Sequence, residues 1–253
     1  EQRLVLATDF FMDLAYDFSS SRSTNKRYIY DADASGNYTV LNDSLSSDFE
    51  VNTYRHTPNI GFNYDHEAWR INTNVGLLNT ILQNENLLNP ANFDNTYNNL
   101  YLSARVRYEL ERSKSISVDY RTNANTPSIR QLQPVADRTN PLNVVVGNPA
   151  LRPAYSHNIG ANFRSFNFGA GGGSGIFSSF DLSFTENQVV SVSTIGDDLR
   201  RTTTYANVDG AMSAGARIFY TKSSRKEEKE FRYNFSLSGN FSRNVGFTNG
   251  TLF

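Results

Sequence analysis

The 253-residue chain contains no cysteine, one tryptophan and three histidines. The missing cysteine excludes disulfides and every reaction that needs a thiolate. His56, His66 and His157 are far apart in the sequence and lack the spacing of metal ligands, and no serine is set beside one of them by a motif. We therefore expect no enzyme, no metal site and no cofactor.

Long apolar runs are also missing. No stretch approaches the roughly 20 apolar residues of a membrane-spanning helix, and no signal-peptide pattern follows Glu1. If the protein is exported, we expect the sequence to be a mature chain or a section of a longer one. A formal net charge of −1 gives no basic footprint for nucleic acid. The glycine-rich stretch 169–175 lacks the lysine of a phosphate-binding loop and is predicted to be a turn.

Apolar residues make up 38% of the chain, yet 13% of its residues are aromatic. Soluble domains that build a core are usually nearer to half apolar. The composition therefore predicts either a small core or strands with only one apolar face.

A clear alternation of apolar and polar residues runs through Leu100–Asn125. Leu100, Leu102, Ala104, Val106, Tyr108 and Leu110 alternate with polar residues, and Ile116, Val118 and Tyr120 do the same after a short charged turn. Side chains of a strand point to opposite faces in turn, so a hairpin with one apolar and one charged face is predicted. In a soluble sandwich the apolar face would be core, whereas in an outer-membrane barrel it would meet lipid and the charged face would line the lumen.

Strand length and loop asymmetry favour the barrel. The alternation in Leu4–Ser19, which we predict to be one strand, is more than twice as long as the usual five or six residues. Tyr64 and Trp69 flank a tight turn, where aromatic rings would meet a membrane interface. Long polar connections alternate with short turns, as in barrels with long extracellular loops. The long connections are predicted at Ser20–Ser47, Asn79–Thr96 and Thr126–Ala154.

Further strands are predicted from the same alternation. They are Phe49–Tyr64, Trp69–Leu77, Tyr155–Phe168, Ile176–Val190, Val208–Thr221 and Phe231–Arg243, with a turn at Asp197-Asp198 and a connection at Lys222–Glu230. The total is about nine strands, and an open sheet edge is prohibitive in lipid. The sequence therefore predicts an all-β antiparallel transmembrane barrel of which this chain is a section.

The connection Thr126–Ala154, which follows the hairpin of Leu100–Asn125, resembles a known family. TPSIRQLQP at 126–134, NPL at 140–142 and GNPALRP at 147–153, followed by Tyr155-Ser156-His157-Asn158, are similar to the barrels of Bacteroidetes TonB-dependent receptors, nearest to the SusC-related group. The resemblance implies a 22-stranded barrel in the bacterial outer membrane, a plug that binds TonB, and active import of a siderophore, glycan or peptide. It makes residues 1–253 a partial barrel domain whose plug lies outside the chain. Membrane lipid, the plug with the TonB complex and a surface lipoprotein are the expected partners.

Five prolines in this connection fix φ and remove hydrogen-bond donors, and Gly147 allows a backbone conformation that other residues avoid. We predict a stiff, folded loop, which is either a wall of the substrate vestibule or a clamp that seals the barrel rim. Charges on the face opposite the apolar one either bind plug or substrate or pair with one another to hold register. These charges are Arg105, Arg107, Asp119, Arg121, Arg164, Asp181, Arg217 and Arg232. The candidates for contact with substrate or plug are Arg105, Asp119, Arg121, Arg130, Gln131, Asn148 and Arg152.

The sequence leaves two alternatives open. A complete small barrel with an adhesin or structural role would have only a signal peptide upstream of Glu1, whereas an importer would have a plug of about 150 residues there, in keeping with ordinary domain sizes. A soluble β-sandwich would be a compact monomer in water without detergent.

Overall fold

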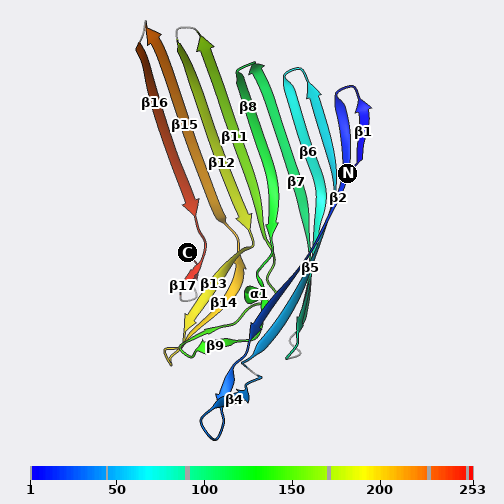
Figure 1. Ribbon diagram of the computed structural model, residues 1–253, viewed down its shortest axis with the longest axis vertical. Helices are drawn as coiled ribbons and strands as arrows, with labels where there is room; N and C mark the ends of the chain where they lie inside the picture. The colour runs from blue at the N-terminus through cyan, green and yellow to red at the C-terminus, as the bar shows by residue number, and fades with distance from the viewer. Residues whose placement is uncertain are drawn as a thin grey trace.

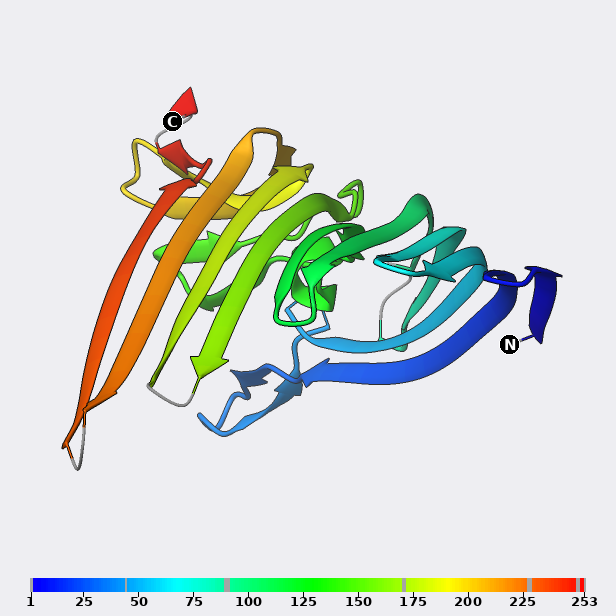
Figure 2. The same cartoon turned by 90° about the horizontal axis from the view of Figure 1, so that it is seen from above.

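The computed structural model describes residues 2–43, 45–88, 92–169, 172–226, 229–248 and 251–252. Its main body is a ten-stranded antiparallel sheet (Figure 1). In spatial order its strands are β1 (Gln2–Ala7), β2 (Phe10–Arg27), β5 (Ser47–His66), β6 (Trp69–Asn86), β7 (Phe93–Glu111), β8 (Lys114–Asn125), β11 (Ala154–Gly169), β12 (Gly172–Glu186), β15 (Ala211–Lys226) and β16 (Lys229–Arg243). The sheet is strongly curved and open, with β1 and β16 at its two separate edges (Figure 2).

The remaining elements lie in the connections and after β16. They are β3 (Tyr30–Ala32), β4 (Tyr38–Leu41), α1 (Ile129–Leu132), β9 (Asp137–Asn140), β10 (Asn143–Val145), β13 (Gln188–Ile195), β14 (Arg201–Val208), β17 (Phe247–Thr248) and β18 (Thr251–Leu252). Strands β13, β14, β10 and β9 form a four-stranded sheet in which β10 and β14 are parallel, so two different connections are joined. Among the described residues, no helix is long and apolar enough to cross a membrane.

The connections confirm the predicted asymmetry. Thr8-Asp9, Glu67-Ala68 and Arg112-Ser113 close short turns at one end of the sheet, where two-residue breaks also separate β11 from β12 and β15 from β16. The connections that hold the small elements gather at the opposite end (Figure 1). We call these the short-turn end and the loop end.

The prediction of one strand over Leu4–Ser19 is wrong. The segment is a hairpin of β1 and β2 with its turn at Thr8-Asp9. A regular two-residue turn would place the apolar residues of β1 and β2 on opposite faces of the sheet. A bulge shifts the register from Val5↔Phe11 to Ala7↔Phe10, and this shift keeps the apolar residues of both strands on the same face. The apolar alternation therefore continues unbroken across the turn, which hides it in the sequence and raises the strand count from about nine to ten.

The strand ends also differ from the prediction. Strands β2, β6 and β7 continue well into the polar stretches that we predicted as connections, and β15 and β16 extend to Lys226 and Lys229. The ladder of backbone hydrogen bonds persists where the side chains on both faces become polar. Conversely, β12 ends at Glu186, because Asn187 adopts a positive φ of 53° before the chain enters β13.

The apolar face of the sheet is exposed. Val118 on β8 is 45% exposed and Phe235 on β16 is 58% exposed, and the row Phe231, Leu237 and Phe241 is likewise uncovered. At the short-turn end the rings of Trp69 and Tyr108 lie 4.6 Å apart, as in an aromatic girdle. A barrel wall presents an exposed apolar face of this kind to lipid, whereas a soluble sandwich would bury it against a second layer.

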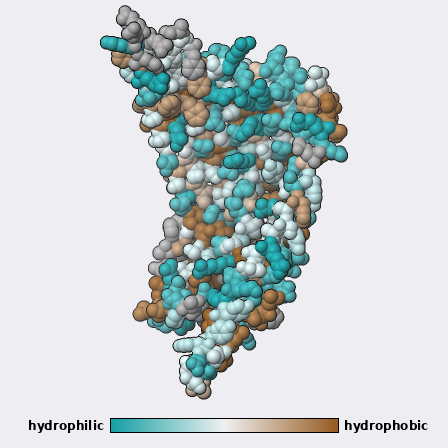
Figure 3. Space-filling model, in the orientation of Figure 1, coloured by the Kyte–Doolittle hydropathy of each residue, from teal (hydrophilic) through white to brown (hydrophobic). Residues whose placement is uncertain are grey.

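The other face is polar along the long strands and covered at the loop end. Hydrophilic residues predominate over the long strands in the view of Figure 3. The small core consists of Val51 and Leu82 from β5 and β6 with Leu132 and Leu151 from the 126–153 loop. Since Val51 and Leu82 point to the face opposite the lipid, this loop folds back over the inner side of the wall.

Candidate functional site

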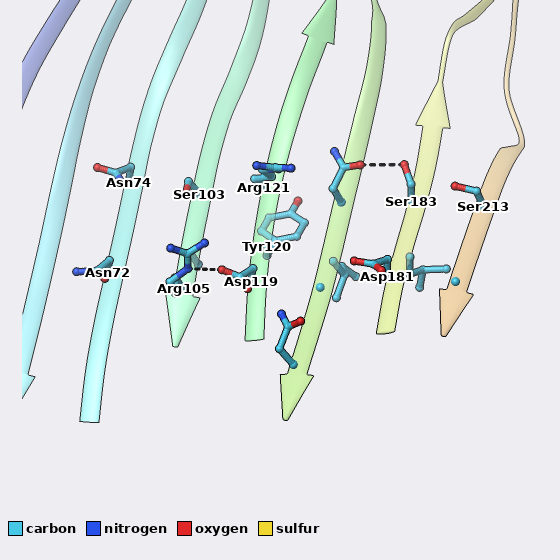
Figure 4. A pocket seen from close by; sticks show the side chains of 17 residues that line it. Asn72, Asn74, Ser103, Arg105, Asp119, Tyr120, Arg121, Asp181, Ser183 and Ser213 are labelled. Atoms are coloured by element: carbon cyan, nitrogen blue, oxygen red, sulfur yellow. Dashed lines mark hydrogen bonds and ion pairs between the residues drawn. The ribbon is translucent and has the colours of Figure 1, made fainter. Parts of the chain in front are cut away.

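A hollow of about 520 Å³ lies on the polar face of the central strands (Figure 4). Its floor follows one row of cross-strand partners. The row is Asn72, Arg105, Asp119, Gly160, Asp181 and Gly215. We call this hollow with its lining the trough.

Glycine explains why the wall is hollow here. A Cβ built at Gly215 would meet nothing within 4 Å, and one at Gly160 would only approach Asp119 and Asp181 at 3.9 Å. Two side chains are thus missing from a row that otherwise carries polar groups. The trough results from this absence.

Three of the predicted site residues come together in the trough. Arg105 Nε donates to Asp119 Oδ1 between β7 and β8 (Figure 4). Arg121 lies two residues further along β8, and neither Arg121 nor Asp181 has a hydrogen bond or an ion pair within the described part of the chain. The trough therefore offers one cation and one carboxylate to an external partner.

Other charges on this face are engaged locally. Arg107 pairs with Glu109 at 3.1 Å, and Arg164 Nε donates to Ser115 Oγ at 2.8 Å. Of the eight charges predicted to face the lumen, Arg105 and Asp119 pair with each other. Cross-strand partners elsewhere in the sheet also form ion pairs, namely Arg3 with Asp13, Lys26 with Asp48 and Arg70 with Asp65, so mutual pairing between neighbouring strands recurs along the wall.

The four predicted residues in the 126–153 loop lie apart from the trough. Gln131 Oε1 accepts hydrogen bonds from Ser128 N at 2.8 Å and Ser128 Oγ at 3.0 Å, forming a box at the start of α1. Asn148 Nδ2 donates to Tyr205 O at 2.9 Å. The main chain of Arg152 exchanges two hydrogen bonds with the Asn207 amide, at 2.8 and 2.9 Å.

These contacts join the loop to β14, and two more join it to β7. Asn95 Nδ2 donates to Pro149 O at 3.0 Å, and Tyr97 OH donates to Leu151 O at 2.9 Å. Leu132 and Leu151 are each only 2% exposed. The prediction of a folded loop is confirmed, and the side-chain amides of Gln131 and Asn148 form hydrogen bonds that hold its shape.

The predicted role of Gly147 is wrong in its mechanism. Among the glycines of the described residues, a positive φ is found at Gly36, Gly172 and Gly210, and not at Gly147. A Cβ at Gly147 would instead lie 2.3 Å from Gln133 O and 2.9 Å from Gln131 O. Glycine is required because two backbone segments approach closely, and Gly147 N donates to Gln133 O at 2.9 Å.

A charged cluster fixes the rim where β2 meets β5, outside the membrane-spanning part. Asp48 Oδ2 accepts from Tyr28 OH at 2.6 Å and from Lys26 Nζ at 3.0 Å. These two hydrogen bonds, that of Tyr28 first, hold the pKa of Asp48 below its ordinary value, and the bond to Asp48 raises the pKa of Lys26. The cluster anchors the start of the β3–β4 hairpin.

The histidines are far apart and contact other groups. His56 Nδ1 lies 2.7 Å from Tyr16 OH, His157 Nδ1 lies 2.8 Å from Tyr120 OH, and His66 Nδ1 lies 2.7 Å from Asp9 Oδ2. The described part of the chain holds no group of three or more His, Cys, Asp or Glu side chains arranged for a metal ion.

Comparisons with known proteins agree with this architecture. The sequence pattern of the Outer membrane protein beta-barrel family matches residues 10–251. The chain belongs to this family. As a member of the family it resides in the outer membrane, and its exposed apolar face is the lipid-facing surface of a barrel wall. A sequence comparison with curated proteins finds no match.

Two solved structures share the fold of this family member. Copper transporter OprC superimposes with a TM-score of 0.58 at 13% identity, over 91% of this chain and 36% of that chain. The FrpB iron transporter from Neisseria meningitidis gives a TM-score of 0.56 at 10% identity, over 95% of this chain and 34% of that one. The chain thus spans about a third of the length of these transporters.

Sequence reasoning missed one feature at the loop end. Arg55 on β5 lines an apolar chamber beneath α1 and also the adjoining hollow that contains Asp17. Its inward orientation follows from the alternation in β5. The chamber itself depends on how the loop folds back, and no local pattern reports that.

Proposed function

We propose that the chain is a wall section of a TonB-dependent outer-membrane importer of the SusC-related type found in Bacteroidetes. Membership of the outer-membrane barrel family and a fold shared with a copper transporter and an iron transporter support this proposal. The remaining strands and a plug domain would lie outside these 253 residues. Energy would come from the TonB complex through that plug, and a surface lipoprotein is a further candidate partner.

The observation that carries the proposal is the charged trough on the inner wall. Arg121 and Asp181 point into it without partners among the described residues. Charges inside a barrel are tolerated when water or a polar domain meets them. A plug that offers a carboxylate to Arg121 and a donor to Asp181 would satisfy both.

The predicted site residues then divide between two tasks. Arg105, Asp119 and Arg121 would contact the plug or a passing substrate along the wall. Arg130 and Arg152 would face the vestibule, while Gln131 and Asn148 would act by holding the loop in shape, since their amides bond within it.

Uptake by cells tests the proposal. Cells with and without the full-length gene are compared for uptake of labelled ferric siderophore, oligosaccharide and peptide, each with and without a protonophore. The proposal expects one class to be lost with the gene and to be abolished by the protonophore. Uptake that ignores the protonophore, or no gene-dependent uptake together with lost surface adhesion, would favour a small barrel with a passive or structural role.

A further inference from the structure

A half-open apolar chamber of about 420 Å³ lies beneath α1 at the loop end. Ligand pockets for small molecules usually measure roughly 300–1,000 Å³. The wall contributes Val51, Thr53 and Leu82, and the loop contributes Pro127, Ile129 and Leu132. The chamber thus lies between two parts of the chain that are far apart in sequence.

The chamber is preformed rather than a gap in loose packing. Its wall residues Val51 and Leu82 are 4% and 5% exposed, and they belong to the small core with Leu132. The loop above them is held by Tyr97 and Asn95 from β7. Because the chamber already has a fixed shape, binding of a ligand would cost little conformational entropy.

Two arginines flank this apolar space. Arg55 lines both the chamber and the adjoining hollow toward the trough, and Arg130 lines both the chamber and the hollow beside Arg27. Neither has a hydrogen bond or an ion pair within the described part of the chain. Asp17 shares a hollow with Arg55 but forms no ion pair with it.

A buried amide adds hydrogen-bonding capacity to the same region. Asn84 is 3% exposed, and its Nδ2 and Oδ1 atoms both lack partners within the described residues. Its cross-strand neighbours Val51 and Phe93 both line the chamber. An unpaired buried amide lowers the stability of the fold, and a ligand group that formed a hydrogen bond with Asn84 would remove this penalty.

We propose that this chamber binds an amphipathic organic anion, with a small apolar body under α1 and one carboxylate between Arg55 and Arg130. Arginine binds carboxylates through paired N–H donors, and the apolar side chains of the lining favour an apolar body over a glycan. The inference rests on the proposed import function and assigns the substrate class. It separates this protein from importers of neutral sugars.

Direct binding tests the assignment independently of uptake. The full-length protein in lipid nanodiscs is titrated calorimetrically with 4-phenylbutyrate and with the neutral analogue 4-phenylbutanol, against empty nanodiscs. We expect saturable binding of the anion at least tenfold tighter than of the alcohol. Arg55→Gln and Arg130→Gln should each weaken the anion at least fivefold, and Arg55→Lys should recover part of the loss.

Two further variants separate the chamber from the rest of the lumen. Thr53→Trp fills the chamber and should abolish binding, whereas Arg217→Gln removes an exposed arginine of the same face outside the chamber and should leave it unchanged. Equal binding of acid and alcohol, or binding that survives Thr53→Trp in a folded protein, would overturn the assignment. Protonophore-sensitive uptake without anion binding would overturn it as well while leaving the import function standing.

Discussion

Arg105 on β7 and Asp119 on β8 are direct cross-strand partners and form an ion pair on the lumen face of the wall. The pair lies between Asn72 and Gly160 in the row that floors the trough. The charged face that the sequence predicts therefore contains a specific ion pair between two neighbouring strands.

This pair should contribute little to stability. The Arg105 side chain is 66% exposed, and exposed pairs contribute about 0–1 kcal/mol. Arg105→Ala should therefore lower the free energy of unfolding in urea by less than about 1 kcal/mol. Asp119→Ala alone and the double variant complete a cycle that isolates the pair. A coupling above roughly 2 kcal/mol would mean that the trough is dry and that the pair is buried by another domain.

Spin labels test the orientation of the wall. Labels at Val106, Val118 and Phe235 should collide with oxygen dissolved in lipid and should be shielded from an aqueous nickel quencher, because these side chains point away from the lumen. Labels at Ser117 and Ser236, the neighbouring residues on the opposite face, are the matched controls and should show the reverse. Aqueous exposure of Val118 would refute a lipid-facing surface.

The alternation of side chains made the hairpin of β7 and β8 predictable, because lipid and lumen impose opposite chemistry on the two faces. Where that contrast ends, the prediction failed. The polar sequence at the end of β2 predicts a loop, although its backbone still pairs with β5 as far as Arg27. The turn at Thr8-Asp9 was hidden because its bulge preserves the phase.

The candidate site was predicted in part for the same reason. Arg105, Asp119 and Arg121 follow from strand phase alone. The close approach at Gly147 and the chamber beside Arg55 arise from contacts between distant segments, which no local pattern encodes.

The folded loop should depend on its two buried leucines. Leu132→Ala removes a side chain that is 2% exposed and should cost about 2–5 kcal/mol of local stability. Leu142→Ala, in the same loop but 66% exposed, is the control and should change little. Hydrogen exchange of the Gly147 and Leu151 amides measures the effect. Equal protection in both variants would contradict a packed loop.

Gly147 should tolerate no side chain. Gly147→Ala places a Cβ against Gln133 O and Gln131 O, and overpacking of this kind costs about 1–3 kcal/mol. The matched control is Gly239→Ala on β16, where a Cβ meets nothing within 4 Å. Limited proteolysis at the exposed Leu142 should accelerate in the first variant alone. Unchanged cleavage would show that the loop backbone can separate at no cost.

The cluster of Asp48, Lys26 and Tyr28 predicts how the rim responds to pH. The Tyr28 hydrogen bond lowers the pKa of Asp48 from its ordinary 3.8, so the contribution of this carboxylate is present above 3.8 and is lost as pH falls through the lower folded value. The pKa of Lys26 is raised from 10.5 chiefly by its hydrogen bond to Asp48, so that contribution is complete below 10.5 and is lost as pH rises through the higher value. Protection of the Ile29 amide, which donates to Ser46 Oγ at 2.9 Å, should therefore form a plateau between these limits.

Substitution of the carboxylate separates this cluster from general acid unfolding. Asp48→Asn should weaken Ile29 protection on the plateau and remove its decline at low pH, because no charge remains to titrate. Asp31→Asn, on the same hairpin but outside the cluster, should leave the decline in place. If both variants retained the decline, carboxylates elsewhere would govern the rim, and Asp48 would not be its anchor.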